Sequence, residues 1–345
     1  MKKTNAFALA GLGGFNAHGA GFLDAARKCD VVPDLITATS GQIIVLSEWL
    51  QRHDLEKALV IPELVHNPAA QLAIALAGDP GIFRPAYPEM LRRWLTPPSP
   101  TGNPVEALLD RLVPAQLYVP VRPAADFSKI ADVFNNEPDI GIIFNAYNLQ
   151  TGRSVLFGNP RAQGLQGLWP RNKSNEAATR SVAEMDDPKA EPELRPITRE
   201  AVESALWLSL YGFDHLPKPH LIDGAYDRSC IVAELHKFDR IFVARPLAQG
   251  WLDKGGPSNW FEVQDWQTEM WFSASYKAEV DALNQINGLV HTGKLKDDNY
   301  KEVKLIEIAP ETPAGFFNYF IERKGVYKRA YDLAMEKFKE IAVAQ

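Results

Sequence analysis

The sequence predicts an α/β fold with a mostly parallel central sheet, and three observations support this prediction. Short apolar strands alternate with amphipathic helices, a pattern typical of strand–helix units. The 345 residues are 46% hydrophobic and 23% charged, an ordinary globular composition, and a chain of this length can bury a stable core without disulfides. The two cysteines, Cys29 and Cys230, have no metal-binding spacing and are interpreted as reduced thiols of a cytoplasmic protein.

The charge and the hydropathy of the chain narrow the classes of function. The formal net charge is −6, and the lack of a basic footprint argues against nucleic acid as a partner. A mildly acidic balance says little beyond solubility. No stretch reaches the roughly 18 uninterrupted apolar residues that a membrane-spanning helix needs.

The first 53 residues predict a strand, a glycine-rich loop, a helix, a second strand, a tight turn and a second helix. The strands cover residues 6–10 and 35–39, and the helices cover 19–28 and 42–52. The N-terminus also imitates a secretory signal peptide, because two lysines precede an apolar run and small residues near Ala20. We favour the strand, since the motif continues without a break and cleavage near Ala20 would destroy it.

The rest of the chain predicts further strands surrounded by helices. Residues 55–135 are expected to be mainly helical, and the tract of about 158–196 is expected to be a long loop, disordered or solvated rather than a structured lid. The other expected helices are 197–211, 231–237 and most of 259–345, and the expected strands are 139–146, 154–157, 219–222, 240–244 and 303–308.

Three separated segments carry residues suited to catalysis, and the first is a glycine loop. Gly11, Gly13 and Gly14 lie between a strand and a helix, where glycines let the backbone turn its N–H groups toward one point. Such a loop can hold a phosphate or a developing oxyanion. A dinucleotide-binding loop is the alternative, but that motif requires a third glycine where Asn16 stands.

The second segment places Ser40 at the end of an apolar strand, immediately before a helix. This is the arrangement of a nucleophile elbow, although a serine that caps an ordinary helix has the same local pattern. The third segment is Asp223-Gly224-Ala225, which follows a short strand and by itself indicates only a turn.

Together the three segments resemble the patatin-like phospholipase family, and the order and spacing match over about residues 5–245. The resemblance implies a three-layer α/β/α fold, with residues 1–250 as the catalytic domain and 251–345 as a helix-rich C-terminal extension packed on it. It also implies Ser40 as nucleophile and Asp223 as its only catalytic partner. The implied oxyanion hole consists of backbone N–H groups of Gly11, Gly13, Gly14 and Gly41.

The elbow departs from the family pattern on both sides of the serine. The family has glycine two residues before and two residues after the nucleophile, where this chain has Ala38 and Gln42. Alanine is small enough for the turn, whereas Gln42 needs additional room. These departures motivate a second hypothesis, a catalytically weak or inactive patatin-like protein that binds acyl chains or a protein partner. A third hypothesis is an acyltransferase or polyester depolymerase that uses the same dyad.

A Ser-His-Asp triad is the alternative mechanism. The histidines that follow Ser40 at suitable positions lie outside any recognisable motif: His215, His220, His236 and His291. His18, near the glycine loop, is expected to pack on the short helix rather than line the site. No HExxH or comparable metal-binding spacing occurs, and no cofactor is implied.

The resulting expectation is a lipolytic esterase that hydrolyses fatty acyl esters such as phospholipids or lysophospholipids. The site motif accounts for an esterase, and only the family resemblance points to lipids. Late tryptophans, including Trp266 and Trp271, could face a lipid surface, but a buried amphipathic helix has equal spacing. Peripheral membrane contact and the oligomeric state stay open at this point.

Overall fold

The computed structural model describes most of the chain. The described residues are 3–11, 16–59, 83–95, 103, 105, 116, 118–165, 194–248, 256–257, 260–295, 300–310 and 323–343. Their centre is an eight-stranded sheet with the order β10-β9-β1-β2-β5-β6-β7, and β8 pairs with β5 beside this path. Its strands are β1 Asn5–Leu9, β2 Leu35–Ala38, β5 Gly141–Asn148, β6 Arg153–Gly158, β7 Arg195–Pro196, β8 Leu221–Asp223, β9 Arg240–Ala244 and β10 Lys304–Ile308.

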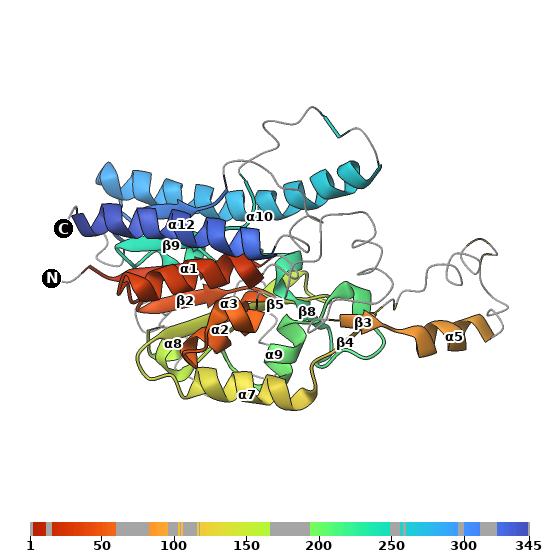
Figure 1. The fold of residues 1–345 in the computed structure, drawn as a ribbon. Coiled ribbons are helices and arrows are strands. Elements are labelled where there is room, and N and C mark those ends of the chain that lie inside the picture. The colour runs from red at the N-terminus through yellow and green to blue at the C-terminus, as the bar shows by residue number, and fades with distance from the viewer. Residues whose placement is uncertain are drawn as a thin grey trace, which may run out of the picture.

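The sheet is mostly parallel, because β10, β9, β1, β2 and β5 all run in one direction. Strands β6 and β8 are antiparallel to β5. Helices cover both faces of this sheet, as Figure 1 shows. The prediction of an α/β fold with a mostly parallel sheet is confirmed.

The helices form the outer layers of the molecule. They are α1 Asn16–Lys28, α2 Gln42–Leu50, α3 Leu55–Leu59, α5 Tyr87–Leu95, α7 Ala124–Asn135, α8 Pro160–Leu165, α9 Arg199–Ala205, α10 Trp260–His291 and α12 Arg323–Val343. Short 3-10 turns occur at Ser209–Tyr211, Gly224–Tyr226 and Ala233–Leu235. A separate two-stranded antiparallel sheet joins β3 Phe83–Pro85 to β4 Tyr118–Pro120.

Side-chain alternation along β1 divides the core between the two faces of the sheet. Phe7 and Leu9 belong to the cluster under α1, α2, α7 and α12, whereas Ala6, Ala8 and Ala10 belong to the cluster under α8 and α10. This alternation is the period of two that a strand imposes on its side chains. The expected first strand is therefore confirmed, and it lies between β2 and β9.

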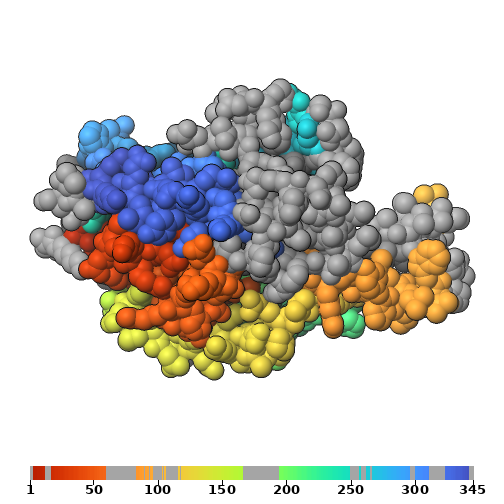
Figure 2. All heavy atoms as spheres, in the orientation of Figure 1, coloured from red at the N-terminus to blue at the C-terminus, as the bar shows by residue number. Residues whose placement is uncertain are grey.

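The C-terminal part of the chain adds to the same layers. Strand β10 pairs in parallel with β9 and so extends the main sheet. Helix α12 packs along α1, and Figure 2 shows its atoms directly against those of the N-terminal helix. Residues 251–345 were predicted as an extension packed on residues 1–250, and they contribute a strand as well as helices.

Two predicted helices are wrong in extent. The helix expected over 197–211 ends at Ala205, because the Trp207 carbonyl accepts the Asp223 N–H at 3.1 Å and the Trp207 indole donates to the Gly212 carbonyl. The helix expected over 231–237 is a single 3-10 turn. The Glu279 carboxylate accepts the N–H groups of Val232 and Ala233, and this interaction holds the segment in a turn.

Two other tracts are only partly described. Residues 55–135 were expected to be mainly helical. Two short strands, β3 and β4, lie within this range and pair with each other, so the helices there are interrupted. Most of residues 60–117 lie outside the described residues. The long loop expected over 158–196 begins with β6 and α8 and ends with β7, and its central part, 166–193, also lies outside them.

Candidate active site

Ser40 occupies a sharp turn between β2 and α2. The strand ends at Ala38, the helix begins at Gln42, and Ser40 has a φ of +56°. A non-glycine residue rarely adopts this left-handed region, because its Cβ then crowds the backbone. Such strain is typical of functional turns, and a serine that simply caps a helix has an extended backbone instead. Ser40 is 2% exposed.

The first glycine of the loop makes room for this turn. A Cβ on Gly11 would lie 2.3 Å from the Thr39 carbonyl oxygen and 2.8 Å from the Ser40 Cβ, so no larger residue fits there. The Gly11 N–H donates to the Ser229 carbonyl at 2.8 Å. Gly11 was predicted as an oxyanion donor. In this arrangement its N–H is already bonded, and its contribution is the close approach of the loop to Ser40.

Gln42, the residue that departs most from the family pattern, is accommodated by a second glycine. Its side chain is 1% exposed, and its amide oxygen lies where a Cβ on Gly19 would be, only 1.9 Å from that position. Gly19 is in the first turn of α1, and glycine inside a helix weakens it relative to alanine. The room that a small residue usually provides inside the elbow is therefore provided by the facing helix.

Asp223 reaches Ser40 from the opposite side, across 183 residues of sequence. It ends β8, which pairs with β5 so that Asp223 lies opposite Ala146. The Ser40 hydroxyl donates to Asp223 Oδ2 at 2.5 Å, and the Ala225 N–H donates to Oδ1 at 2.9 Å. The structure thus brings these two predicted residues into direct contact.

The burial of Asp223 changes its protonation. The carboxyl group is 1% exposed, and loss of water raises its pKa from 3.8 to about 7, although the hydrogen bonds from Ser40 and Ala225 act in the opposite direction. A group that titrates near neutral pH can both accept and return a proton. A buried, perturbed carboxyl in contact with a hydroxyl is typical of a catalytic site.

Asn145 is a further residue of the site that the sequence analysis missed. It is fully buried on β5, and its Nδ2 donates to the carbonyls of Gly224 at 3.1 Å and Arg228 at 3.0 Å. These bonds hold the turn that follows Asp223. The available signal was a lone amide in the apolar strand run, because a polar residue inside a buried strand needs a specific partner.

The histidines are engaged elsewhere. His18 Nε2 lies 3.0 Å from the Ile308 carbonyl, and burial lowers its pKa to about 4, so it is neutral and donates to that oxygen at neutral pH. His236 contacts the Ala233 carbonyl and stacks on Tyr300. His291 pairs with Glu302 near the end of α10. His215 and His220 are exposed. Within the described part of the chain, the hydrogen bonds of Ser40 and Asp223 include none to a histidine.

The other predicted oxyanion donors are only partly described. Gly41 directly follows Ser40 and precedes the first residue of α2, so its N–H belongs to the end of a helix whose dipole favours a negative charge. Gly13 and Gly14 lie outside the described residues. Among the described residues, no group of acidic, histidine or cysteine side chains is suited to hold a metal ion. In the same part of the chain, no helix has the length and apolar character needed to cross a membrane.

No family model matches the sequence, and no curated protein matches it. Among solved structures, the crystal structure of VipD from Legionella pneumophila is similar at 10% sequence identity and a TM-score of 0.38. The match covers 99% of this chain and 67% of that one. A likeness of this size carries no argument about activity, which has to come from the site itself.

Proposed function

We propose that this chain is a serine acyl hydrolase of the patatin-like type, with Ser40 as nucleophile and Asp223 as the base. The contact between the Ser40 hydroxyl and Asp223 at 2.5 Å is the observation that carries the proposal. A serine hydroxyl is a poor nucleophile until a neighbouring group accepts its proton. A buried carboxylate with a pKa near 7 is better suited to this role than an exposed one with a pKa near 4.

In the proposed reaction, Asp223 accepts the proton as Ser40 Oγ attacks the ester carbonyl carbon. The tetrahedral oxyanion is held by backbone N–H groups, for which Gly41, Gly13 and Gly14 stay the predicted donors. One such donor typically contributes roughly 3–4 kcal/mol to lowering the barrier. Collapse expels the alcohol, which takes the proton from Asp223, and leaves an acyl group on Ser40. Asp223 then deprotonates a water that releases the fatty acid, and Ser40 regains its proton.

Acyl esters of lipids are the proposed substrates, and lipid surfaces the proposed place of action. Helix α5 lies at the end of the molecule away from the two chain termini, as Figure 1 shows. One side of this helix carries exposed apolar side chains at helical spacing, Tyr87, Leu91, Trp94 and Leu95. An amphipathic helix with an apolar face of this kind can lie in a membrane interface.

The contact with a lipid surface has its own test. We expect Trp94→Ser with Leu95→Ser to reduce co-sedimentation with phosphatidylcholine vesicles several-fold. Trp271→Ser, on the exposed part of α10, is the matched control for loss of a surface tryptophan. Equal sedimentation of the α5 variant and the wild type would exclude α5 from this role.

The proposal also retains a cytoplasmic location, because both cysteines are free thiols.

A fluorophosphonate probe tests the catalytic proposal most directly. We expect the wild type to be labelled and Ser40→Ala to lose the label completely, with hydrolysis of a short-chain p-nitrophenyl ester reduced at least about 10³-fold. Ser128→Ala, at a partly exposed position of α7, should keep both properties. A folded wild-type protein that takes no label would instead favour the binding hypothesis.

A further inference from the structure

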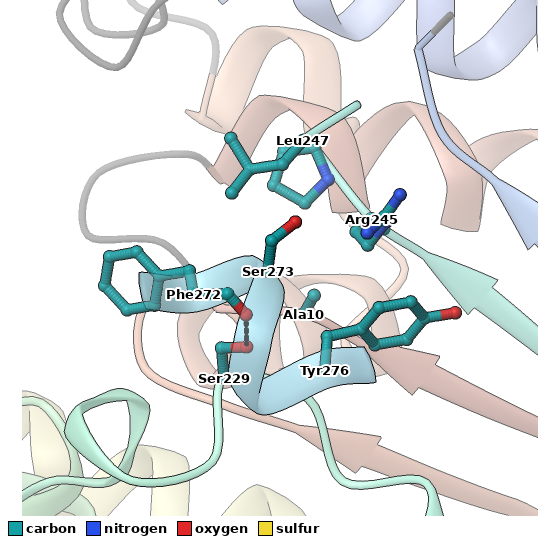
Figure 3. A pocket seen from close by; sticks show the side chains of 8 residues that line it. Ala10, Ser229, Arg245, Leu247, Phe272, Ser273 and Tyr276 are labelled. Carbon is teal, nitrogen blue, oxygen red and sulfur yellow. Dashed lines mark hydrogen bonds between the residues drawn. The ribbon is translucent and has the colours of Figure 1, made fainter. Parts of the chain in front are cut away.

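A second polar site lies beside the loop that approaches Ser40, in a small hollow at the ends of β1 and β9. The hollow is lined from β9 and its continuation by Arg245, Pro246 and Leu247, and from α10 by Phe272, Ser273 and Tyr276, with Ala10 and Ser229 completing it. Figure 3 shows Arg245 beside the Tyr276 ring and the Ser273 hydroxyl on the same side of the hollow as Leu247. The enclosed part of the hollow admits about one water-sized group and the hollow is partly open, so it has no room for an acyl chain.

Arg245 is the unusual feature of this hollow. Its side chain is buried, with 3% of the residue exposed, yet its Nε and Nη2 atoms have no hydrogen-bond partner among the residues that the structure describes. These two nitrogens form one edge of the guanidinium, the edge that binds two oxygens of a carboxylate or phosphate in parallel. A buried charge normally has a compensating partner, because loss of water is costly for an ion.

The surrounding residues hold the guanidinium while leaving that edge available. The Arg245 Cζ lies 4.6 Å from the centroid of the Tyr276 ring, a cation–π contact that uses the face of the group and not its edge. The Tyr276 hydroxyl donates to Glu307, which fixes the ring. The backbone N–H of Arg245 donates to the Ile308 carbonyl at 3.0 Å, which fixes the main chain from which the side chain extends.

Ser273 supplies a second unsatisfied donor from a different element. Its Oγ is buried on α10 and also has no hydrogen-bond partner in the described part of the chain. Glu269 lies one turn before Ser273 and has interactions of its own. Three donors therefore border one hollow, two from Arg245 after the end of β9 and one from Ser273 on α10. The oxygens of a tetrahedral oxyanion point in several directions, so such an ion can accept hydrogen bonds from both residues.

The hollow lies close to the proposed nucleophile in the sheet. Leu9 of β1 pairs with Ala244 of β9 on one side and with Ala38 of β2 on the other. Neighbouring strands are spaced by about 4.8 Å, so the ends of β9 and β2 are about 10 Å apart. Ser229, which lines the hollow, also accepts the N–H of Gly11.

We propose that this hollow binds a phosphate group, held by the Nε–Nη2 edge of Arg245 and the hydroxyl of Ser273. The group is either free phosphate or the phosphate of an acyl ester whose carbonyl lies at Ser40. The second source rests on the proposed function, whereas the binding site itself does not.

The binding test uses the full chain with Ser40→Ala and inorganic phosphate, followed by calorimetry at ionic strength held constant with chloride. We expect saturable binding that Arg245→Gln weakens at least tenfold. Arg245→Lys, which keeps the charge but not the edge, should weaken it several-fold, and Ser273→Ala should do so to a smaller extent. Arg199→Gln, at an exposed arginine, is the charge control and should leave binding unchanged. Absence of binding, or equal binding by Arg245→Gln and the control, overturns the proposal.

The kinetic arm identifies the source of the phosphate and uses a lysophospholipid and a monoacylglycerol with the same acyl chain. If the phosphate belongs to the substrate, Arg245→Gln lowers the ratio of the two kcat/KM values at least tenfold. An unchanged ratio together with lost phosphate binding assigns the site to the free ion. Phosphate binding in a chain that proves inactive would refute the catalytic proposal and leave the site standing. If Arg245→Gln does not fold, Ser273→Ala decides.

Discussion

Two buried clusters near the turn after β8 differ in how their charges are matched. At Ser40 the Asp223 carboxyl is bonded to a hydroxyl and a backbone N–H, and its pKa is raised to about 7. Among the described residues, no cationic side chain bonds to it. Five residues later, Arg228 donates to both oxygens of Glu234 at 2.6 and 2.7 Å and also to Glu279. Burial alone would lower the pKa of Arg228, but the two carboxylates raise it above its usual value.

The difference in charge matching separates the Arg228 cluster, which stabilises the fold, from the Ser40–Asp223 pair, which is suited to proton transfer. The Arg228 cluster fastens α10 to the turn after Asp223, because Glu279 lies on α10 and also accepts two backbone N–H groups of residues 232 and 233. A matched buried ion pair keeps its protonation state over the ordinary pH range. A buried carboxyl that is not bonded to a cation has a raised pKa, so it titrates near neutral pH, where it can exchange a proton during catalysis. Arg245 is a buried cation with no ion pair to an acidic side chain among the described residues, so it resembles Asp223 and not Arg228.

The largest expected effect is on catalysis at the unmatched carboxyl. Asp223→Asn keeps the shape of the side chain but removes the proton acceptor, so we expect kcat/KM for ester hydrolysis to fall at least about 10³-fold. For the wild type, kcat/KM should rise through about pH 7 as Asp223 ionises. His236→Ala is the control and should retain most of the activity. Retained activity in Asp223→Asn together with lost activity in His236→Ala would indicate a histidine-dependent mechanism.

The next largest effect is expected on stability at the matched cluster. Arg228→Met leaves Glu234 and Glu279 buried without their cation, and we expect it to lower the free energy of unfolding by about 3–5 kcal/mol. Arg245→Met removes no ion pair and loses mainly the contact with Tyr276, so its cost should stay below about 2 kcal/mol. Urea denaturation of both variants measures the contrast. Equal costs would mean that Arg245 has a compensating anion after all.

The pH dependence of stability sharpens the same contrast. Because the folded pKa of Asp223 is raised, the folded protein retains a proton that the unfolded chain has released. This stabilisation is fully present below about pH 4 and is lost as the pH rises through about 7. It amounts to roughly 4 kcal/mol at most. Asn mimics the protonated acid, so the stability gain of Asp223→Asn over the wild type should grow from pH 5 to pH 8. A gain that does not change with pH would contradict the shifted pKa.

The smallest expected effect concerns the packing that supports the elbow. Gly19→Ala puts a methyl group where the Gln42 amide lies, and overpacking of this kind typically costs about 1–3 kcal/mol. Gln42→Ala in the same chain should restore most of the loss, because it removes the clashing group. Thermal unfolding of the two single variants and the double variant gives the coupling. Additive costs would show that Gly19 and Gln42 do not depend on each other.

The local pattern of the first 53 residues was predictable, because each element there is marked by its own residues. Strands β1 and β2 and helices α1 and α2 occur within a few residues of their expected limits. The signal-peptide interpretation depended on the apolar run, and β1 occupies part of that run between two other strands. The nucleotide-binding alternative depended on the glycine loop, where Gly13 and Gly14 lie outside the described residues. The catalytic roles of Ser40 and Asp223 stay predictions, although the two side chains do meet.

Other features could not be obtained from local pattern, because distant groups decide them. The helix before β8 stops early where the Trp207 carbonyl bonds to Asp223, and the turn at 233–235 is held by Glu279 from α10. The contacts of Asn145 and Arg245 depend equally on groups far away in the chain. Neither residue lies in a motif.

The sequence alone determined the alternation of strands and helices, because the spacing of apolar side chains differs between the two. It also determined the glycine at position 11, a residue type that gives the backbone additional freedom, and the place of Ser40 at the end of β2. Only the tertiary structure decided that Asp223 contacts Ser40 and that Gly19 makes room for Gln42. It also decided that Arg245 is buried with two guanidinium nitrogens unbonded among the described residues. The physical reason is that protonation, close packing and charge matching depend on distances between remote residues. Those distances exist only once the sheet has assembled.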